Sequence, residues 1–322
     1  YFKSVLIISD YERVVVILAI RIVLGTSVVC LATISNAINM AVFARQGLDS
    51  SMNLTFFSLS ACNLVSALLI LWMNVNASLV LFGGNLPAGL NDVVYLTGGW
   101  PTACIFRTAS WITAYITAER CACVAFPLTV KRVITPFRTA GALATLAAVN
   151  VAALAPVYAS AYFDRKFNAE TNSTSVVLAF GSNRDFNEGV AFILHACLIA
   201  TSLVLLAAFT CALIGQLERS SRWRKDTSFN VKQVETMSVK QKRTIALVIV
   251  VACVMIACYS PLVTLSVVEI FVDDFRESGT YGNIYKISWA ASFVLGAVSS
   301  SVNILFYYKM SSRYRDAFRE LF

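Results

Sequence analysis

The chain has 322 residues, of which 58% are hydrophobic and 14% charged, and its formal net charge is +8. Soluble domains are about 45–50% apolar and about 25% charged, so this composition excludes a soluble enzyme, a disordered chain and a disulfide-stapled secreted module. It indicates a protein whose solvent is mostly lipid. In such a protein the excess of Lys and Arg belongs on the cytoplasmic side of a membrane, and we expect no nucleic-acid partner.

Seven apolar stretches follow one another along the chain, and each reaches the roughly 20 residues that a membrane-spanning helix needs. Backbone groups inside a bilayer must be hydrogen-bonded within the protein, which makes each span a helix. The predicted spans are residues 14–44, 52–73, 93–126, 139–163, 189–217, 244–271 and 287–308. The tail 311–322 is too short to span and predicts an amphipathic helix on the inner leaflet. We therefore expect an all-α membrane protein, a single domain over 1–322 with a seven-transmembrane helix bundle at 14–308 and a short helix 8.

Loop charges predict the orientation. The first, third and fifth connections and the tail carry 16 Lys and Arg, whereas the opposite side carries 7. Cytoplasmic loops are enriched in these residues, so we predict a multi-pass protein of the plasma membrane with an extracellular N-terminus and a cytoplasmic C-terminus. The sequon that begins at Asn172 falls on the outer side and predicts a glycosylation site there.

Signs of catalysis are missing from the sequence. It holds one histidine, no glycine-rich phosphate loop and no pair of carboxylates within one span. Its nine cysteines lie in apolar stretches without the spacing of a zinc or haem site. We therefore predict no enzyme activity, no catalytic residue, no metal site and no cofactor.

Polar groups inside a membrane are costly, so the few present are candidates for function. Glu119 and Arg120 near the inner end of the third span can form an ion pair that opens and closes. The alternative is an ion pair at the helix end, beside the lipid headgroups, with no switching role. Pro261 in the sixth span removes a helical hydrogen bond and predicts a hinge beside Tyr259, unless it is merely a tolerated membrane proline. Asn303 in the seventh span, which follows three serines, favours close packing or polar contacts between helices.

In this order and in these segments, the motifs resemble the rhodopsin-like (class A) G-protein-coupled receptors over about 14–322. The matching positions are Asn36, Asn63 (where Asp is usual), Glu119-Arg120-Cys121, Pro127, Cys258-Tyr259-Ser260-Pro261 and Asn303 to Tyr307 (with Ile304 where Pro is usual). Two sequence motifs, Gly98-Gly99-Trp100-Pro101 and Glu119-Arg120-Cys121-Ala122-Cys123, resemble those of the expanded group of molluscan chemosensory receptors.

The resemblance implies a cell-surface receptor that binds an extracellular small molecule or peptide and activates a heterotrimeric G protein when helix six moves outward. The implied switch residues are Asn36, Asn63, Glu119, Arg120, Tyr259, Pro261, Asn303 and Tyr307. The residues implied to frame the G-protein groove are Arg120, Pro127, Lys240, Lys242 and Arg243. The family's outer disulfide is not expected, since Tyr95 stands at its helix-three position and residues 164–188 contain no cysteine.

On the ligand side, Arg107 lies 13 residues before Arg120, about 20 Å of helix toward the outside. A guanidinium at that depth needs a partner, and the candidates are Glu269, backbone carbonyls or an anionic ligand. The predicted ligand-binding residues are Thr102, Phe106, Arg107, His195, Tyr259, Val263, Ser266, Glu269, Trp289 and Phe293.

A seven-helix transporter or a ligand-gated channel is the alternative. Such a protein would show paired interrupted helices or a file of carboxylates within the membrane. Only Glu269, near an outer helix end, fits that pattern, and the loop charges oppose the inward N-terminus of an insect-type odorant channel.

Overall fold

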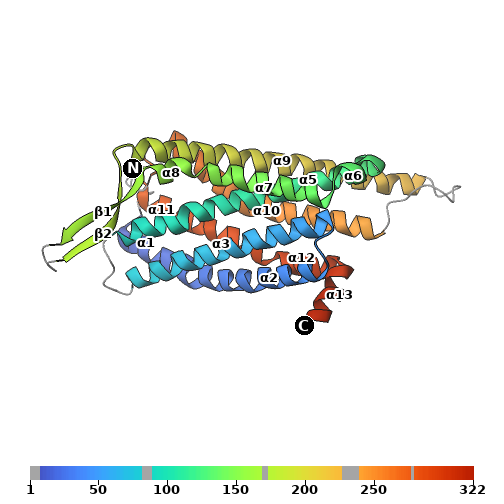
Figure 1. The fold of residues 1–322 in the computed structure, drawn as a ribbon, viewed down its shortest axis with the longest axis horizontal. Helices are drawn as coiled ribbons and strands as arrows, with labels where there is room; N and C mark the ends of the chain where they lie inside the picture. Colours follow the sequence, from blue (N-terminus) through green and yellow to red (C-terminus); the bar gives the residue numbers. More distant parts are fainter. Residues whose placement is uncertain (1–7, 82–88, 169–172, 227–238, 277–278) are drawn as a thin grey trace.

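The computed structural model describes residues 8–81, 89–168, 173–226, 239–276 and 279–322. Long helices run side by side along one axis and form a bundle (Figure 1). The first half contains α1 (Asp10–Ile17), η1 (Leu18–Gly25), α2 (Thr26–Arg45), α3 (Ser51–Leu81), α4 (Leu90–Val94), η2 (Tyr95–Gly99), α5 (Trp100–Ala125) and α6 (Pro127–Val133). The second half contains α7 (Pro136–Ala152), α8 (Ala155–Ala159), β1 (Ala161–Asn168), β2 (Ser173–Phe180), α9 (Arg184–Asp226), α10 (Val239–Phe271), α11 (Gly282–Ser301), α12 (Asn303–Met310) and α13 (Ser312–Leu321).

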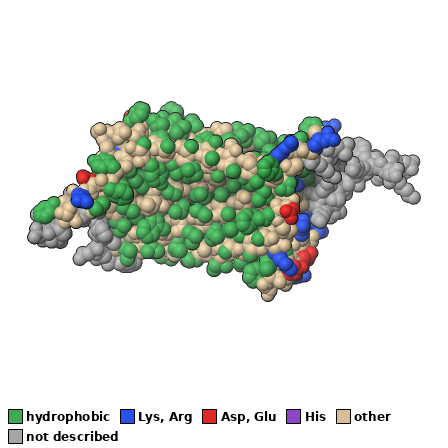
Figure 2. Space-filling view, viewed as in Figure 1, with side chains coloured by type: hydrophobic (Ala, Val, Ile, Leu, Met, Phe, Trp, Pro, Cys, Tyr) green, Lys and Arg blue, Asp and Glu red, His purple; other side chains and the backbone are tan. Residues whose placement is uncertain are grey.

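The surface of the bundle matches a lipid environment. Apolar side chains cover its middle, whereas Lys, Arg, Asp and Glu gather toward the ends (Figure 2). Within the described residues, six helical segments are long and apolar enough to cross a membrane. These segments are Asp10–Arg45, Ser51–Leu79, Pro136–Ala159, Arg184–Arg219, Lys242–Phe271 and Gly282–Met310.

The predicted third span is the remaining long helix, and it differs in where it packs. Its core, α5, contacts α3, α7, α9 and α10, and most of its side chains are buried within the protein. A helix that is surrounded by other helices touches little lipid, so its polar side chains can be paired inside the bundle. This position accommodates the two buried charged residues of α5, Arg107 and Glu119.

The predicted fourth span is wrong at its outer end. We expected one helix over 139–163, but α7 ends at Ala152 and the short α8 ends at Ala159. The next residues form β1, which pairs antiparallel with β2 from Ala161 opposite Phe180 to Asn168 opposite Ser173. The apolar run alone did not separate helix from strand here. The aromatic residues Tyr162 and Phe163 and the β-branched pair Val176 and Val177 suit a hairpin, which extends beyond the bundle (Figure 1).

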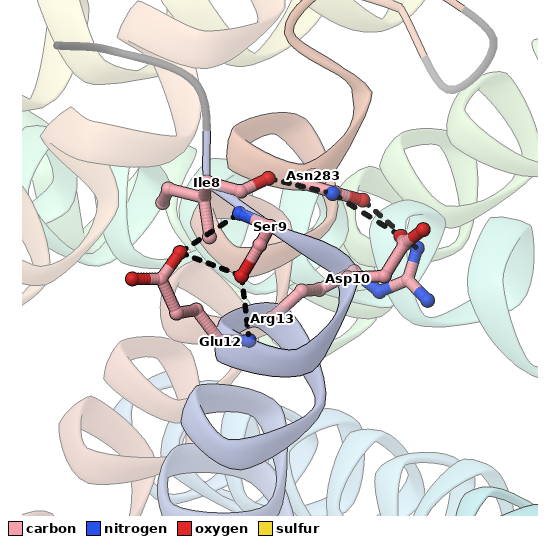
Figure 3. A network of polar contacts seen from close by, with 6 residues as sticks. All are labelled: Ile8, Ser9, Asp10, Glu12, Arg13 and Asn283. Carbon is pink, nitrogen blue, oxygen red and sulfur yellow. Dashed lines mark hydrogen bonds and ion pairs between the residues drawn. The ribbon is translucent and has the colours of Figure 1, made fainter.

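At the same end of the bundle, the start of α1 is tied to α11 (Figure 3). Ser9 caps the helix by accepting from the Glu12 backbone, while the Glu12 carboxylate accepts from the Ser9 backbone at 2.8 Å. Asn283 accepts from the Arg13 guanidinium at 2.8 Å and donates to the Ile8 carbonyl at 2.8 Å. These contacts hold the first and last long helices together on this side.

The predicted amphipathic tail helix is confirmed as α13, whose first turn is capped by Ser311. Its main anchor is Tyr314, which is 1% exposed and donates to Asn39 Oδ1 at 2.6 Å. Burial raises the pKa of the Tyr314 phenol, so it stays a neutral donor. Tyr314 therefore attaches the start of α13 to α2. The end of α13 is less buried, since Leu321 is 40% exposed.

Tyr314→Phe is expected to destabilise the folded protein. The change leaves Asn39 Oδ1 buried without its donor, and the Asn39 amide nitrogen already has no partner among the described residues. An unpaired buried polar group costs about 1–3 kcal/mol. Thermal unfolding in detergent micelles, followed by helical circular dichroism, should show a lower midpoint. Tyr11→Phe is the matched control because Tyr11 is 78% exposed; equal midpoints for the two variants would contradict the anchoring role.

Candidate functional site

The deepest charge in the bundle is Arg107 on α5, which is fully buried. Its Nε donates to Asn150 Oδ1 at 3.2 Å and its Nη2 donates to the Asn150 carbonyl at 2.9 Å. Its Nη1 lies 3.0 Å from His195 Nδ1. Arg107 therefore joins α5 to α7 and α9 through neutral groups, one of them the backbone carbonyl that we considered.

Glu269 is not the partner of Arg107, which corrects one of the three alternatives. Its Oε1 accepts from the Tyr285 hydroxyl at 3.1 Å, so this carboxylate joins α10 to α11. Residue spacing placed both charges toward the outer half of the bundle, but the two helices present them to different neighbours. Asn150 was not predicted at all, although an amide in an otherwise apolar span was a usable signal.

A row of aromatic rings leads from this polar cluster toward the middle of α10. The His195 ring lies 6.4 Å from the Trp289 ring, and Trp289 lies 6.0 Å from Phe293. Phe293 lies 6.1 Å from Phe106, which lies 5.4 Å from Tyr259. The structure thus brings five predicted ligand-side residues into one continuous set of contacts, which we call the aromatic row.

The other predicted ligand-side residues lie elsewhere. The Thr102 hydroxyl points to Met73 Sδ at 3.9 Å, and the Ser266 hydroxyl donates to the Leu262 carbonyl of its own helix at 2.9 Å. Val263 packs against the core. An open apolar groove of about 690 Å³ lies between α12 and α13, and its lining contains none of the predicted ligand-binding residues.

The hinge predicted in α10 has a specific local geometry. Pro261 lies inside the helix and has no N–H to give to the carbonyl four residues earlier, that of Ala257. The Ser260 hydroxyl donates to that carbonyl at 3.1 Å. A hydroxyl on a rotatable side chain therefore replaces a backbone hydrogen bond, which keeps the carbonyl satisfied at the proline.

At the inner end of α5, Arg120 Nη2 and Glu119 Oε1 form an ion pair at 2.6 Å. The Glu119 side chain is 3% exposed and that of Arg120 is 17% exposed. Glu119 Oε2 and Arg120 Nε are buried, and neither has a hydrogen-bond partner among the described residues. The pair thus uses only part of the bonding capacity of each group.

The remaining switch candidates lie at contacts between helices. Asn36 donates to the Ser300 carbonyl at 3.2 Å, which links α2 to α11, and Asn63 is buried on α3. Asn303 begins α12 after a one-residue turn at Val302, so the predicted seventh span lies within the segment Gly282–Met310 and is interrupted at that turn. Tyr307 packs on Phe43 and Phe56 at 5.2 Å each.

The predicted G-protein side is described only in part. Lys242 is half-buried and Arg243 is exposed on α10. The backbone of Pro127 and Lys240 lies in described helices, but their side chains are outside the described set, and Asn172 lies outside the described residues. Lys and Arg side chains gather at the end of the bundle that carries α13 (Figure 2).

Comparison with known families gives one match. A family model described as "Serpentine type 7TM GPCR chemoreceptor Srw" matches residues 24–322, which cover almost the whole chain. A search of curated proteins finds no match.

Proposed function

Because this chain belongs to the serpentine 7TM GPCR chemoreceptor Srw family, we propose that it binds an extracellular small molecule or peptide and activates a heterotrimeric G protein. The family makes it a multi-pass, non-enzymatic membrane receptor. We propose that α5, the third long helix along the chain, crosses the membrane together with the six apolar segments and completes the set of seven. We further propose that it lies in the plasma membrane with the N-terminus outside. The sequence motifs at residues 98–101 and 119–123 support a relationship to the molluscan chemosensory receptors.

The observation that carries the proposal is the Glu119–Arg120 ion pair at 2.6 Å. Both residues belong to α5, so the pair can open without melting a helix. Arg has five donors in a fixed fork and can exchange a carboxylate for the carbonyls at the end of a partner helix. The pair is mostly buried, so it stabilises the resting state. Because it is monodentate, a competing acceptor on the G protein can replace Glu119 as the partner of Arg120.

The proline geometry of α10 supports the motion. We propose that a ligand prefers the state in which the inner half of α10 has moved outward around Pro261, which shifts the population toward that state. The aromatic row ends at Tyr259, two residues before Pro261, so a change at His195 or Trp289 reaches the hinge through packed rings. Arg120, Lys242 and Arg243 would then border the groove that receives the G protein.

Glu119→Gln tests the proposal through basal activity. The amide keeps the shape of the side chain but removes its charge, so Arg120 is released without ligand. A loss of about 1 kcal/mol from the resting state raises the active fraction about fivefold. Basal G-protein activation should therefore rise by about that factor in cells at equal surface expression.

Asp316→Asn is the matched control, because Asp316 is an exposed carboxylate on α13. It should leave basal activation unchanged. Basal activation of Glu119→Gln that equals the wild type and this control would contradict the role of the ion pair.

A further inference from the structure

The hydrogen bond between Arg107 and His195 determines which nitrogen of the histidine carries a proton. A guanidinium can only donate, so Nδ1 of His195, 3.0 Å from Arg107 Nη1, must accept. A doubly protonated ring has no acceptor, so the ring is neutral and its single proton is on Nε2. Arg107 therefore presents His195 as an N–H donor on the opposite side of the ring.

In the part of the chain that the structure describes, that donor is buried and unpaired. His195 is 1% exposed, and its Nε2 has no hydrogen-bond partner among the described residues. The same holds for Trp289 Nε1, whose ring lies 6.4 Å from that of His195. Buried polar groups are almost always hydrogen-bonded, and both of these orphan groups are donors. The missing partner is therefore an acceptor.

The charge around this pair of donors favours an anionic acceptor. Arg107 is fully buried, and its hydrogen-bond partners, Asn150 and His195, are neutral. Among the described residues no carboxylate lies within ion-pair distance of it. A buried charge without a counter-ion is costly, and a ligand anion beside His195 would reduce that cost.

The surroundings indicate what carries the anion. Trp289 also contacts Phe192 at 6.5 Å and Phe293 at 6.0 Å between ring centroids. Ligand sites of this kind combine apolar walls with a few orienting polar groups. The Tyr285 ring lies 6.2 Å from Trp289, and its hydroxyl donates to the carboxylate of Glu269.

We propose that His195 Nε2 and Trp289 Nε1 bind the carboxylate of an apolar, aromatic-type acid, with Arg107 as the residue that positions His195. This rests on the proposed receptor function, because it specifies the ligand of that receptor. Arg107 acts through His195 by selecting its tautomer and by supplying positive potential behind the ring.

The chain has a single histidine, so the tautomer can be measured directly. Nitrogen NMR of histidine-labelled, full-length protein in micelles should show one imidazole that is protonated on Nε2. Arg107→Met should abolish this preference, whereas Arg21→Met should keep it, because Arg21 bonds to Asn74 on α3 instead. A wild-type ring protonated on Nδ1, or on both nitrogens at neutral pH, would overturn the proposal even if Arg107→Met fails to fold.

The ligand class is tested with phenylacetate and indole-3-acetate against the amide of each. The acids should shift the His195 resonance at concentrations at least about tenfold lower than the amides, a difference of about 1.4 kcal/mol. Binding of the acids should also raise the melting temperature of the wild-type protein, and His195→Phe should lose this rise. Acids that shift nothing, amides that match the acids, or phenethylamine that binds more tightly would each overturn it. Signalling is a separate readout: acids that bind without activating the G protein support this inference and count against the proposed function.

Discussion

Replacement of Arg120 by alanine is expected to abolish ligand-driven G-protein activation while the receptor still reaches the cell surface. In the proposed active state the guanidinium leaves Glu119 and donates to the partner helix, and alanine offers no donor. Charge-assisted hydrogen bonds contribute about 1.5–3 kcal/mol each, so the loss of one or two reduces coupling by more than tenfold. The measurement is G-protein activation per receptor at the surface.

The control and the double variant make the role of Arg120 specific. Arg319→Ala removes an exposed arginine on α13 and should leave activation unchanged. Combining Glu119→Gln with Arg120→Ala should remove the raised basal activity of the first change, because release of Arg120 matters only if Arg120 is present. Activation of Arg120→Ala at the wild-type level, or a double variant that stays active, would refute the assigned role.

The second large effect concerns Gly296, which lets α11 approach α5. A Cβ atom at this position would overlap the ring of Phe106, which is 2% exposed and is held between Tyr259 and Phe293. Gly296→Ala is therefore expected to lower the stability by about 1–3 kcal/mol, the usual cost of overpacking a core. Thermal unfolding in micelles gives the size of the effect.

Gly141→Ala on α7 is the matched control, because a Cβ there meets nothing within 4 Å. Alanine is the better helix former, so this variant should be neutral or slightly more stable. Adding Phe106→Leu to Gly296→Ala should restore part of the stability by making room for the new methyl group. A Gly296→Ala variant as stable as Gly141→Ala would show that the contact between α5 and α11 tolerates the extra atom.

The end of α11 is a second place, after Pro261 in α10, where the regular hydrogen bonding of a helix is disturbed, here by serine hydroxyls. Ser300 donates to the Ala297 carbonyl and Ser301 to the Val298 carbonyl, each at 2.9 Å. Such bonds compete with the backbone ladder of a helix, and the helix breaks at Val302 before Asn303 begins α12. The sequence departs here from the family's proline, and the serines supply another local reason for the interruption.

The long apolar helices and the tail helix could be predicted from the sequence because hydropathy and segment length are local properties. A bilayer of known thickness needs about 20 apolar residues of helix to be crossed. The sequence also located Glu119, Arg120 and Pro261 by their spacing along helices. It did not separate strand from helix at Ala161, where an apolar run suits either structure.

Which side chains meet depends on how the helices pack together. Spacing sets depth along the bundle axis, and it placed both Arg107 and Glu269 in the outer half. Their partners, Asn150 and His195 for the one and Tyr285 for the other, depend on how each helix is rotated and which helix lies beside it. That rotation is set by packing among all the helices, so no single segment contains the information.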